Sequence, residues 1–170
     1  MIIGNKVILR ALKRSDVLKI LEWRNDSEIS YLTGTVYPIS EIEHEKWIEK
    51  KIQDQNNKIL AIDDLEKKKF IGIIGSKNTD FINRNTELYI YIGEKEYWGK
   101  GYGTDATTTF VKYCFDQLNL HRVYLYVFAY NERAIHSYKK VGFVTEGLLK
   151  DSVYKAGSYH DKILMAIVKN

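Results

Sequence analysis

Hydrophobic positions recur at helical spacing in several segments of the chain. Val17, Ile20 and Trp23 lie three residues apart and predict a first helix, which Ser15 or Asp16 can cap. The same criterion predicts further helices over residues 40–55, 104–118 and 131–142. Residues 26–38 carry no such pattern and end at the only proline of the chain, so they are predicted to be irregular.

Polar residues and glycines mark the ends of these helices. Ser40 and Glu43 match a capping box, in which each side chain accepts a hydrogen bond from the other residue's backbone N–H. Asn131 is a predicted N-cap. Gly142 is a predicted left-handed C-cap, and Phe143 provides the apolar contact beyond it.

Short runs of β-branched and aromatic residues predict about seven strands. They cover residues 7–9, 59–65, 70–74, 87–92, 123–128, 144–149 and 163–168. Residues 67–69 and 156–158 are predicted turns, and residues 80–85 a polar loop. The order β-α-α-β-β-β-α-β-α-β-β predicts an α/β (α+β) fold, in which helices pack on one mixed sheet. No repeat or linker divides the chain, so residues 1–170 are predicted to form a single domain.

Composition adds the class of protein to this picture. Of the 170 residues, 45% are hydrophobic and 28% charged, so the chain can bury a sizeable core and is not predicted to be disordered. No apolar run approaches the roughly 20 residues of a membrane span, and residues 1–6 lack the features of a signal peptide. We therefore expect a soluble, cytoplasmic protein without a membrane partner.

The number of cysteines, the spacing of the histidines and the distribution of charge exclude further classes of protein. Cys114 is the only cysteine and the four histidines are scattered, so neither a disulfide within the chain nor a zinc site is expected. The net charge of +4 is spread along the chain, and its densest run, residues 67–69, lies in a predicted turn. We therefore expect no metal and no nucleic-acid partner.

A glycine-rich segment between a predicted strand and a predicted helix is the strongest candidate for chemistry. It consists of Trp98, Gly99, Lys100, Gly101, Tyr102, Gly103 and Thr104. A helix start exposes unpaired N–H groups at the positive end of the helix dipole, which favours a bound anion. Glycines let the backbone approach a phosphate closely, because no Cβ atom stands in the way. The segment therefore predicts a pyrophosphate-binding loop.

Two common phosphate-binding motifs do not fit this loop. A dinucleotide fingerprint requires glycine at the position of Thr104, together with a parallel βαβ unit. A P-loop requires Lys and then Ser or Thr after its last glycine, whereas Gly101 follows Lys100. A glycine-rich turn without a ligand is the remaining alternative.

The loop resembles the acetyl-CoA pyrophosphate loop of GNAT-superfamily acetyltransferases, whose pattern is Gln or Arg, two residues, Gly, one residue, then Gly or Ala. Gly101 and Gly103 match this pattern. Trp98 occupies the Gln/Arg position and departs from it. The departure resembles the Tyr-Trp-Gly-Lys-Gly-Tyr form of the branch that includes ribosomal-protein N-terminal acetyltransferases.

A second segment resembles the same family. Residues 131–143 are similar to the family element Asn-x-x-Ala-x-x-x-Tyr-x-x-x-Gly-Phe, and the Glu-Gly-Leu of residues 146–148 is also typical. Residues 131–149 look closest to polyamine N-acetyltransferases, such as those acting on spermidine. Two motifs in the right order, with a strand between them, make a stronger case than either alone.

The resemblance implies a GNAT-like fold, with a mixed, mostly antiparallel sheet and helices on both faces. It implies an N-acetyltransferase in which an amine attacks acetyl-CoA directly while both substrates are bound. The acetyl group would lie beside Tyr91, Ile92 and Gly93, whose backbone N–H groups would polarise its carbonyl. Gly93 is expected to mark a bulge or splay that frees these groups from sheet pairing.

The resemblance also implies roles for single side chains. Tyr138 matches the family tyrosine near the CoA sulfur and would protonate the leaving thiolate, unless it only packs against the sheet. Asn131 matches a residue that contacts the cofactor, and it can also be a helix cap. Glu87 resembles a general base that acts through water, a role that needs burial without a partner, or it forms a surface pair with a lysine. His136 lies two residues before Tyr138, hence on a different helix face, and is left out of the site.

The amine acceptor stays open between a polyamine, an amino sugar and the N-terminal amine of a peptide or protein. A polyamine site should present several carboxylates, but residues 31–40, where the polyamine enzymes carry acids, contain none. Asp26, Glu28, Glu41 and Glu43 would compensate only if the fold directs them inward. A non-catalytic acyl-CoA-binding sensor is the alternative function. Many relatives form dimers, which makes a homodimer compatible with the resemblance.

Overall fold

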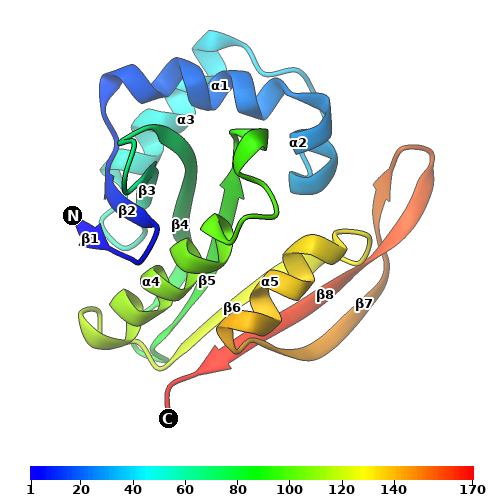
Figure 1. Cartoon of the computed structure of the whole chain (residues 1–170). Coiled ribbons are helices and arrows are strands. Elements are labelled where there is room, and N and C mark those ends of the chain that lie inside the picture. Colours follow the sequence, from blue (N-terminus) through cyan, green and yellow to red (C-terminus); the bar gives the residue numbers. More distant parts are fainter.

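The computed structural model describes all 170 residues and is built around one eight-stranded sheet (Figure 1). The strands follow the order β1-β2-β3-β4-β5-β6-β8-β7, and only the β5–β6 pair is parallel. They are β1 (Ile2–Ile3), β2 (Val7–Ala11), β3 (Ile59–Asp64), β4 (Phe70–Asp80), β5 (Asn85–Ile92), β6 (Arg122–Phe128), β7 (Val144–Lys155) and β8 (Ser158–Val168). The predicted mixed, mostly antiparallel sheet is confirmed, and the short β1 adds one strand to it.

Helices lie on both faces of the sheet, as predicted. They are α1 (Val17–Asn25), α2 (Ser27–Thr33), α3 (Glu41–Gln53), α4 (Tyr102–Asp116) and α5 (Glu132–Val141), with short 3-10 turns at Arg14–Asp16 and Lys95–Tyr97. Figure 1 shows α1, α2 and α3 grouped together, apart from α4 and α5. None of the helices combines the length and the hydropathy that crossing a membrane requires.

The prediction of an irregular stretch over residues 26–38 is wrong, because α2 occupies part of it. The Asp26 carboxylate caps this helix and accepts hydrogen bonds from the N–H groups of Glu28 and Ile29, both at 3.0 Å. Gly34 ends the helix in the left-handed conformation, with φ 87°. Both end signals are present in the sequence. Ile29 is the only buried residue of the helix, so its apolar pattern is too weak to reveal it.

Asp16 stands at the predicted N-cap position of α1, but its side chain does not cap the helix. Its carboxylate instead accepts a hydrogen bond from the Lys13 N–H at 2.7 Å and pairs with Arg10 at 2.8 Å. Arg10 also pairs with Asp63 of β3 at 2.6 Å. Removing one partner of a buried pair costs about 3–5 kcal/mol, so this network ties α1 firmly to β2 and β3.

The other predicted helix ends are confirmed. Ser40 and Glu43 form the reciprocal capping box of α3. The Asn131 side chain accepts a hydrogen bond from the Ala134 N–H at 3.3 Å, and Gly142 is left-handed with φ 113°. Strands β4, β7 and β8 extend beyond their predicted bounds, because their outer ends are largely exposed and lack an alternating pattern.

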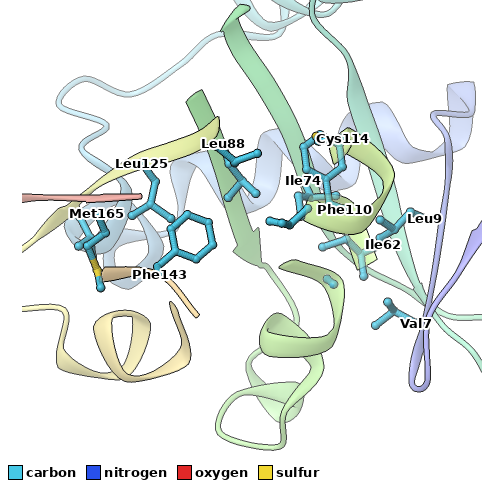
Figure 2. Close-up of a cluster of buried hydrophobic side chains, with 14 of the residues drawn as sticks. Val7, Leu9, Ile62, Ile74, Leu88, Phe110, Cys114, Leu125, Phe143 and Met165 are labelled. Carbon is cyan, nitrogen blue, oxygen red and sulfur yellow. The ribbon is translucent and has the colours of Figure 1, made fainter. Parts of the chain in front are cut away.

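Two hydrophobic clusters define the two faces of the sheet. The larger one lies between the sheet and α4, and Figure 2 shows Phe110 and Cys114 of α4 beside Ile74 and Leu88 of the sheet. The smaller one contains residues of α1, α2 and α3 together with Ile73 of β4. The groups formed by α4 and by α1–α3 therefore pack on opposite sides of the central strands.

Strand β5 presents different side chains to these two faces. Ile90 and Ile92 pack against the α4 cluster, whereas Tyr89 and Tyr91 pack against the α1–α3 cluster. Because successive strand residues point to opposite faces, Glu87 shares the face of the two tyrosines.

The sheet opens between β5 and β6. These parallel strands pair only over residues 85–87 and 122–124. Beyond that point they diverge, and in Figure 1 the yellow β6 leans away from the green β5. The backbone groups on the open side of β5 are therefore available to a ligand.

Candidate active site

A cavity of about 790 Å³ lies at this opening, and residues from all five helices and from β4, β5, β6 and β8 line it. Most of the predicted site residues line the cavity: Glu87, Tyr91, Ile92, Trp98, Gly99, Gly101, Gly103, Thr104, Asn131 and Tyr138. Gly93, Lys100 and Tyr102 do not. The cavity thus joins segments that are distant in the sequence.

The glycine loop gives the cavity an uncapped helix start. Gly99 and Gly101 adopt left-handed conformations, with φ 70° and 85°, which residues with a Cβ atom rarely do. Gly101 is the N-cap of α4 and has no side chain to cap it. The first intrahelical bond runs from the Asp105 N–H to the Gly101 carbonyl at 3.0 Å, so the N–H groups between them have no intrahelical partner. An anion fits this position well.

Lys100 and Tyr102 hold the loop from outside the cavity. The Lys6 ammonium donates a hydrogen bond to the Lys100 carbonyl at 2.9 Å and lies 5.4 Å from the centre of the Tyr102 ring. The Asp105 carboxylate in turn accepts hydrogen bonds from the backbone N–H groups of Lys6 and Val7, at 2.8 and 3.1 Å. These contacts fix the start of α4 to β2.

Trp98 holds the loop from the cavity side. Its indole N–H donates to the Ile92 carbonyl at 2.6 Å, which ties the loop to the end of β5. The Arg133 guanidinium of α5 lies 4.0 Å from the centre of the indole ring and also lines the cavity. A cation therefore stands next to the position where the general family pattern has Gln or Arg. No motif predicts this contact, because Arg133 occupies an unspecified position of the second motif.

Gly93 marks a bulge, as predicted, but its N–H is not freed from the sheet. The N–H groups of Gly93 and Glu94 both donate to the Ile71 carbonyl of β4, at 2.8 and 3.1 Å. Because N–H groups alternate in direction along a strand, the Tyr91 N–H also points to β4, and the Ile92 N–H points to the opening. A Cβ atom on Gly93 would overlap the Trp23 ring, so this glycine permits close packing of α1.

Tyr138 is half-buried on α5 and lines the cavity. Its ring packs 5.8 Å from that of Phe143, and burial raises the pKa of its hydroxyl to about 12. The neighbouring Ser137 exchanges a hydrogen bond of 2.8 Å with Thr104, which fixes α5 against the start of α4. Helix α5, which carries Tyr138, is therefore fixed beside the start of α4, and the tyrosine hydroxyl is protonated at neutral pH.

His136 also lines the cavity, although it lies on a different face of α5 from Tyr138. The cavity follows α5 over most of its length, from Asn131 to Lys140, and takes in more than one face of the helix. Asn131 caps α5 through its side-chain oxygen Oδ1. Its amide N–H groups remain available to a ligand.

Glu87 is buried but paired. Its side chain accepts a hydrogen bond from Asn78 at 2.9 Å and forms an ion pair of 3.0 Å with Lys77. The glutamate is only 7% exposed, whereas the Lys77 side chain is 46% exposed. Glu87 therefore has two partners, unlike the buried carboxylate without a partner that the base role was expected to need.

None of the four carboxylates considered for a polyamine site lines the cavity. Asp26 and Glu28 both pair with Lys95, at 2.9 and 3.0 Å. Glu43 accepts the hydrogen bonds of the α3 capping box. Asp26, Glu28 and Glu43 are therefore engaged in contacts within the fold.

Known proteins are similar to this chain in sequence and in fold. Residues 6–144 match the family model described as an acetyltransferase (GNAT) domain. The spermidine N(1)-acetyltransferase of Vibrio cholerae is 32% identical over 168 residues, which cover 98% of this chain and 95% of the relative. A crystal structure of spermidine N-acetyltransferase from Vibrio cholerae with CoA and spermine matches with a TM-score of 0.88 at 32% identity, over 96% of this chain and 95% of the other. A dodecameric structure of the Vibrio cholerae enzyme matches with a TM-score of 0.81 at 33% identity, over 96% and 94%.

The chain belongs to the GNAT acetyltransferase family, because the family model spans most of its length. It is an N-acetyltransferase with acetyl-CoA as its acyl donor, as the two motifs predict. The alternative of a non-catalytic sensor is thereby set aside.

Proposed function

We propose that the protein transfers the acetyl group to an amine by direct attack within a ternary complex. One continuous cavity carries this proposal, since it joins the start of α4, Tyr138 and the β5 face that bears Glu87. Donor and acceptor can then meet without a covalent enzyme intermediate. The only thiol, Cys114, is buried in the core and is no candidate nucleophile.

The start of α4 is the proposed site of the acetyl-CoA pyrophosphate. Its unpaired N–H groups and helix dipole bind phosphate oxygens, and the left-handed Gly99 and Gly101 keep the approach open. Arg133 adds a positive charge there, which compensates for the tryptophan at position 98. The thioester would then lie in the opening between β5 and β6, where the Ile92 N–H is the proposed donor to the acetyl carbonyl.

Tyr138 is the proposed general acid. As the amine nitrogen bonds to the acetyl carbon and the carbon–sulfur bond breaks, a thiolate leaves. A phenol with a pKa of about 12 carries its proton at neutral pH and can donate it to this sulfur. Burial keeps the proton on the hydroxyl but makes the phenol a weaker acid, so the proposed role rests on the position of Tyr138 in the cavity.

Glu87 is the proposed acceptor of the amine proton, through an intervening water, as a paired carboxylate rather than the unpartnered one expected from the sequence. It is the only carboxylate that lines the cavity, and it lies on the β5 face opposite the α4 cluster. A carboxylate accepts up to about four hydrogen bonds, so the bonds from Lys77 and Asn78 leave capacity for a water.

We also propose that residues 1–170 act as a single domain, since all eight strands join in one sheet. Self-association is proposed as well, because the Vibrio cholerae enzyme has been solved as a dodecamer. Light scattering at several protein concentrations tests it.

Free-thiol release from acetyl-CoA tests the proposed reaction. Spermidine, glucosamine and short peptides with free N-termini serve as acceptors, and mass spectrometry identifies the product. We expect release that depends on one acceptor class, with that amine gaining one acetyl group. Binding of acetyl-CoA without release for any acceptor would contradict the proposal.

A further inference from the structure

The part of the cavity beneath α1 and α3 carries positive charge without matching negative charge. Arg24 of α1 and Lys51 of α3 both line it. Neither forms an ion pair, although most cations of comparable burial elsewhere in the chain do. The only carboxylate of the cavity, Glu87, is already paired with Lys77.

Arg24 is held in place by neutral groups. Its guanidinium lies 4.2 Å from the centre of the Trp47 ring and contacts His44 Nδ1 at 3.0 Å. The other ring nitrogen of His44 lies 2.7 Å from the Val17 carbonyl, so it carries the proton and Nδ1 accepts from Arg24. Burial lowers the pKa of His44, which keeps the ring neutral. The arginine is therefore oriented but not neutralised.

Lys51 stands near Arg24 on the same side of the sheet. Its ammonium lies 5.7 Å from the centre of the Trp47 ring and 5.1 Å from that of Tyr89. Burial lowers its pKa, and no protein acceptor binds its ammonium. A second cation is thus kept at the cavity wall by aromatic rings alone.

Tyr89 and Tyr91 form the aromatic part of the same wall. Their hydroxyl groups are buried and have no hydrogen-bond partner, so they supply no charge that would neutralise the two cations. The guanidinium of Arg24 and the ammonium of Lys51 are therefore the donors of this wall that lack a charged acceptor.

We infer that the acceptor amine also carries an oxyanion, a carboxylate or a phosphate, which binds to Arg24 and Lys51. The inference rests on the proposed transferase function and narrows its substrate class. Charge-assisted hydrogen bonds from a guanidinium favour such groups, whereas a polyamine would bring like charges against two unpaired cations.

These cations do not belong to the pyrophosphate site. They come from α1 and α3, which pack on the face of β5 that presents Tyr89 and Tyr91. The glycine loop leads into α4, which packs on the opposite face. An oxyanion at Arg24 and a pyrophosphate at α4 would therefore occupy opposite sides of the sheet.

Calorimetry on the protein saturated with CoA tests the inference without requiring turnover. The probes are two matched pairs, alanyl-alanine against its C-terminal amide and glucosamine 6-phosphate against glucosamine, together with spermidine. We expect the anionic member of at least one pair to bind about tenfold more tightly than its partner. The pair that responds distinguishes a carboxylate from a phosphate.

Charge-removing variants locate the effect. Arg24→Gln should abolish the preference for the anionic member, whereas Lys19→Gln, on the same helix but outside the cavity, should retain it. Lys51→Gln and its neighbour Lys50→Gln form a second such pair if Arg24→Gln does not fold. Thermal unfolding shows which variants are intact.

Several results would overturn the inference: equal binding within both pairs, tighter binding of spermidine, no binding of either anionic amine, or an Arg24→Gln variant that loses only CoA affinity. Thiol release separates this inference from the proposed reaction. Anion-selective binding without turnover contradicts the reaction alone, and turnover of spermidine alone contradicts the inference alone.

Discussion

The two ends of the cavity present different kinds of groups, backbone groups at one end and side chains at the other. At the start of α4, the proposed recognition relies on backbone N–H groups and glycines from one short segment, residues 98–104. Beneath α1 and α3, it relies on side chains that stand far apart in the sequence, such as Arg24, Lys51 and Tyr89. Backbone recognition requires consecutive residues of special conformation and leaves a motif. Side-chain recognition depends on how helices and strands are brought together.

The two ends are also proposed to bind different substrates. In the proposed division, the donor end provides a helix dipole and Arg133 for the phosphates of acetyl-CoA, and the acceptor end provides unpaired cations for a different ligand. Changes at the donor end should therefore alter acetyl-CoA binding, and changes at the acceptor end should alter acceptor selectivity. Residues between the two ends should alter the rate.

The largest effect is expected between the two ends, at Tyr138. Tyr138→Phe removes the proton donor and should lower kcat by about 10²-fold or more, with little change in acetyl-CoA binding. Steady-state thiol release at saturating substrate concentrations measures it. Tyr113→Phe, which removes a hydroxyl outside the cavity, is the control. A wild-type kcat in Tyr138→Phe would remove this residue from the mechanism.

A smaller loss, about tenfold in kcat/KM, is expected for Glu87→Gln, because an amine that deprotonates in solution bypasses the base. The loss should shrink as the pH approaches the pKa of the acceptor amine. Glu94→Gln removes a paired carboxylate outside the cavity and serves as the control. A loss that is independent of pH would assign Glu87 a positioning role instead.

Gly101→Ala should weaken acetyl-CoA binding by about tenfold, because strain at the left-handed position displaces the N–H groups of the α4 start. Gly157→Ala is a matched control. Gly157 has φ 84° against 85° at Gly101, both lack close neighbours for a Cβ atom, and Gly157 lies in the β7–β8 turn. Calorimetry compares the two. Equal affinity in both variants would place the pyrophosphate elsewhere.

The smallest effect is expected from alkaline pH. The Tyr138 hydroxyl has its pKa raised to about 12, so it stays protonated as the pH rises from 7 to about 10. The kcat profile should therefore show no decline in this range from loss of the acid. A decline that Tyr138→Phe abolishes would show that the hydroxyl ionises earlier.

Much of the fold follows from local signals. The capping box at Ser40, the N-cap at Asn131 and the glycine at 142 mark helix ends because each satisfies backbone groups within a few residues. Helix α2 was not predicted, because it buries only one residue, Ile29, and therefore shows no apolar periodicity. The full lengths of β7 and β8 were not predicted, because an exposed hairpin buries neither face and shows no alternating pattern.

The candidate site divides in the same way. The glycine loop and Tyr138 were visible as motifs, and the structure brings them to one cavity. Arg24, Lys51 and Arg133 were not visible, because an isolated cation in a sequence is usually solvated. Only the fold shows that Arg24 and Lys51 face a cavity whose single carboxylate, Glu87, is already paired with Lys77.

A crystal structure of the protein with CoA is the most direct test of this division. We predict pyrophosphate oxygens within hydrogen-bond distance of the N–H groups that follow Gly101, and the CoA sulfur next to the Tyr138 hydroxyl. Arg24 and Lys51 should remain free of the cofactor and open to an acceptor. A CoA phosphate bound at Arg24, or a sulfur remote from Tyr138, would contradict the account.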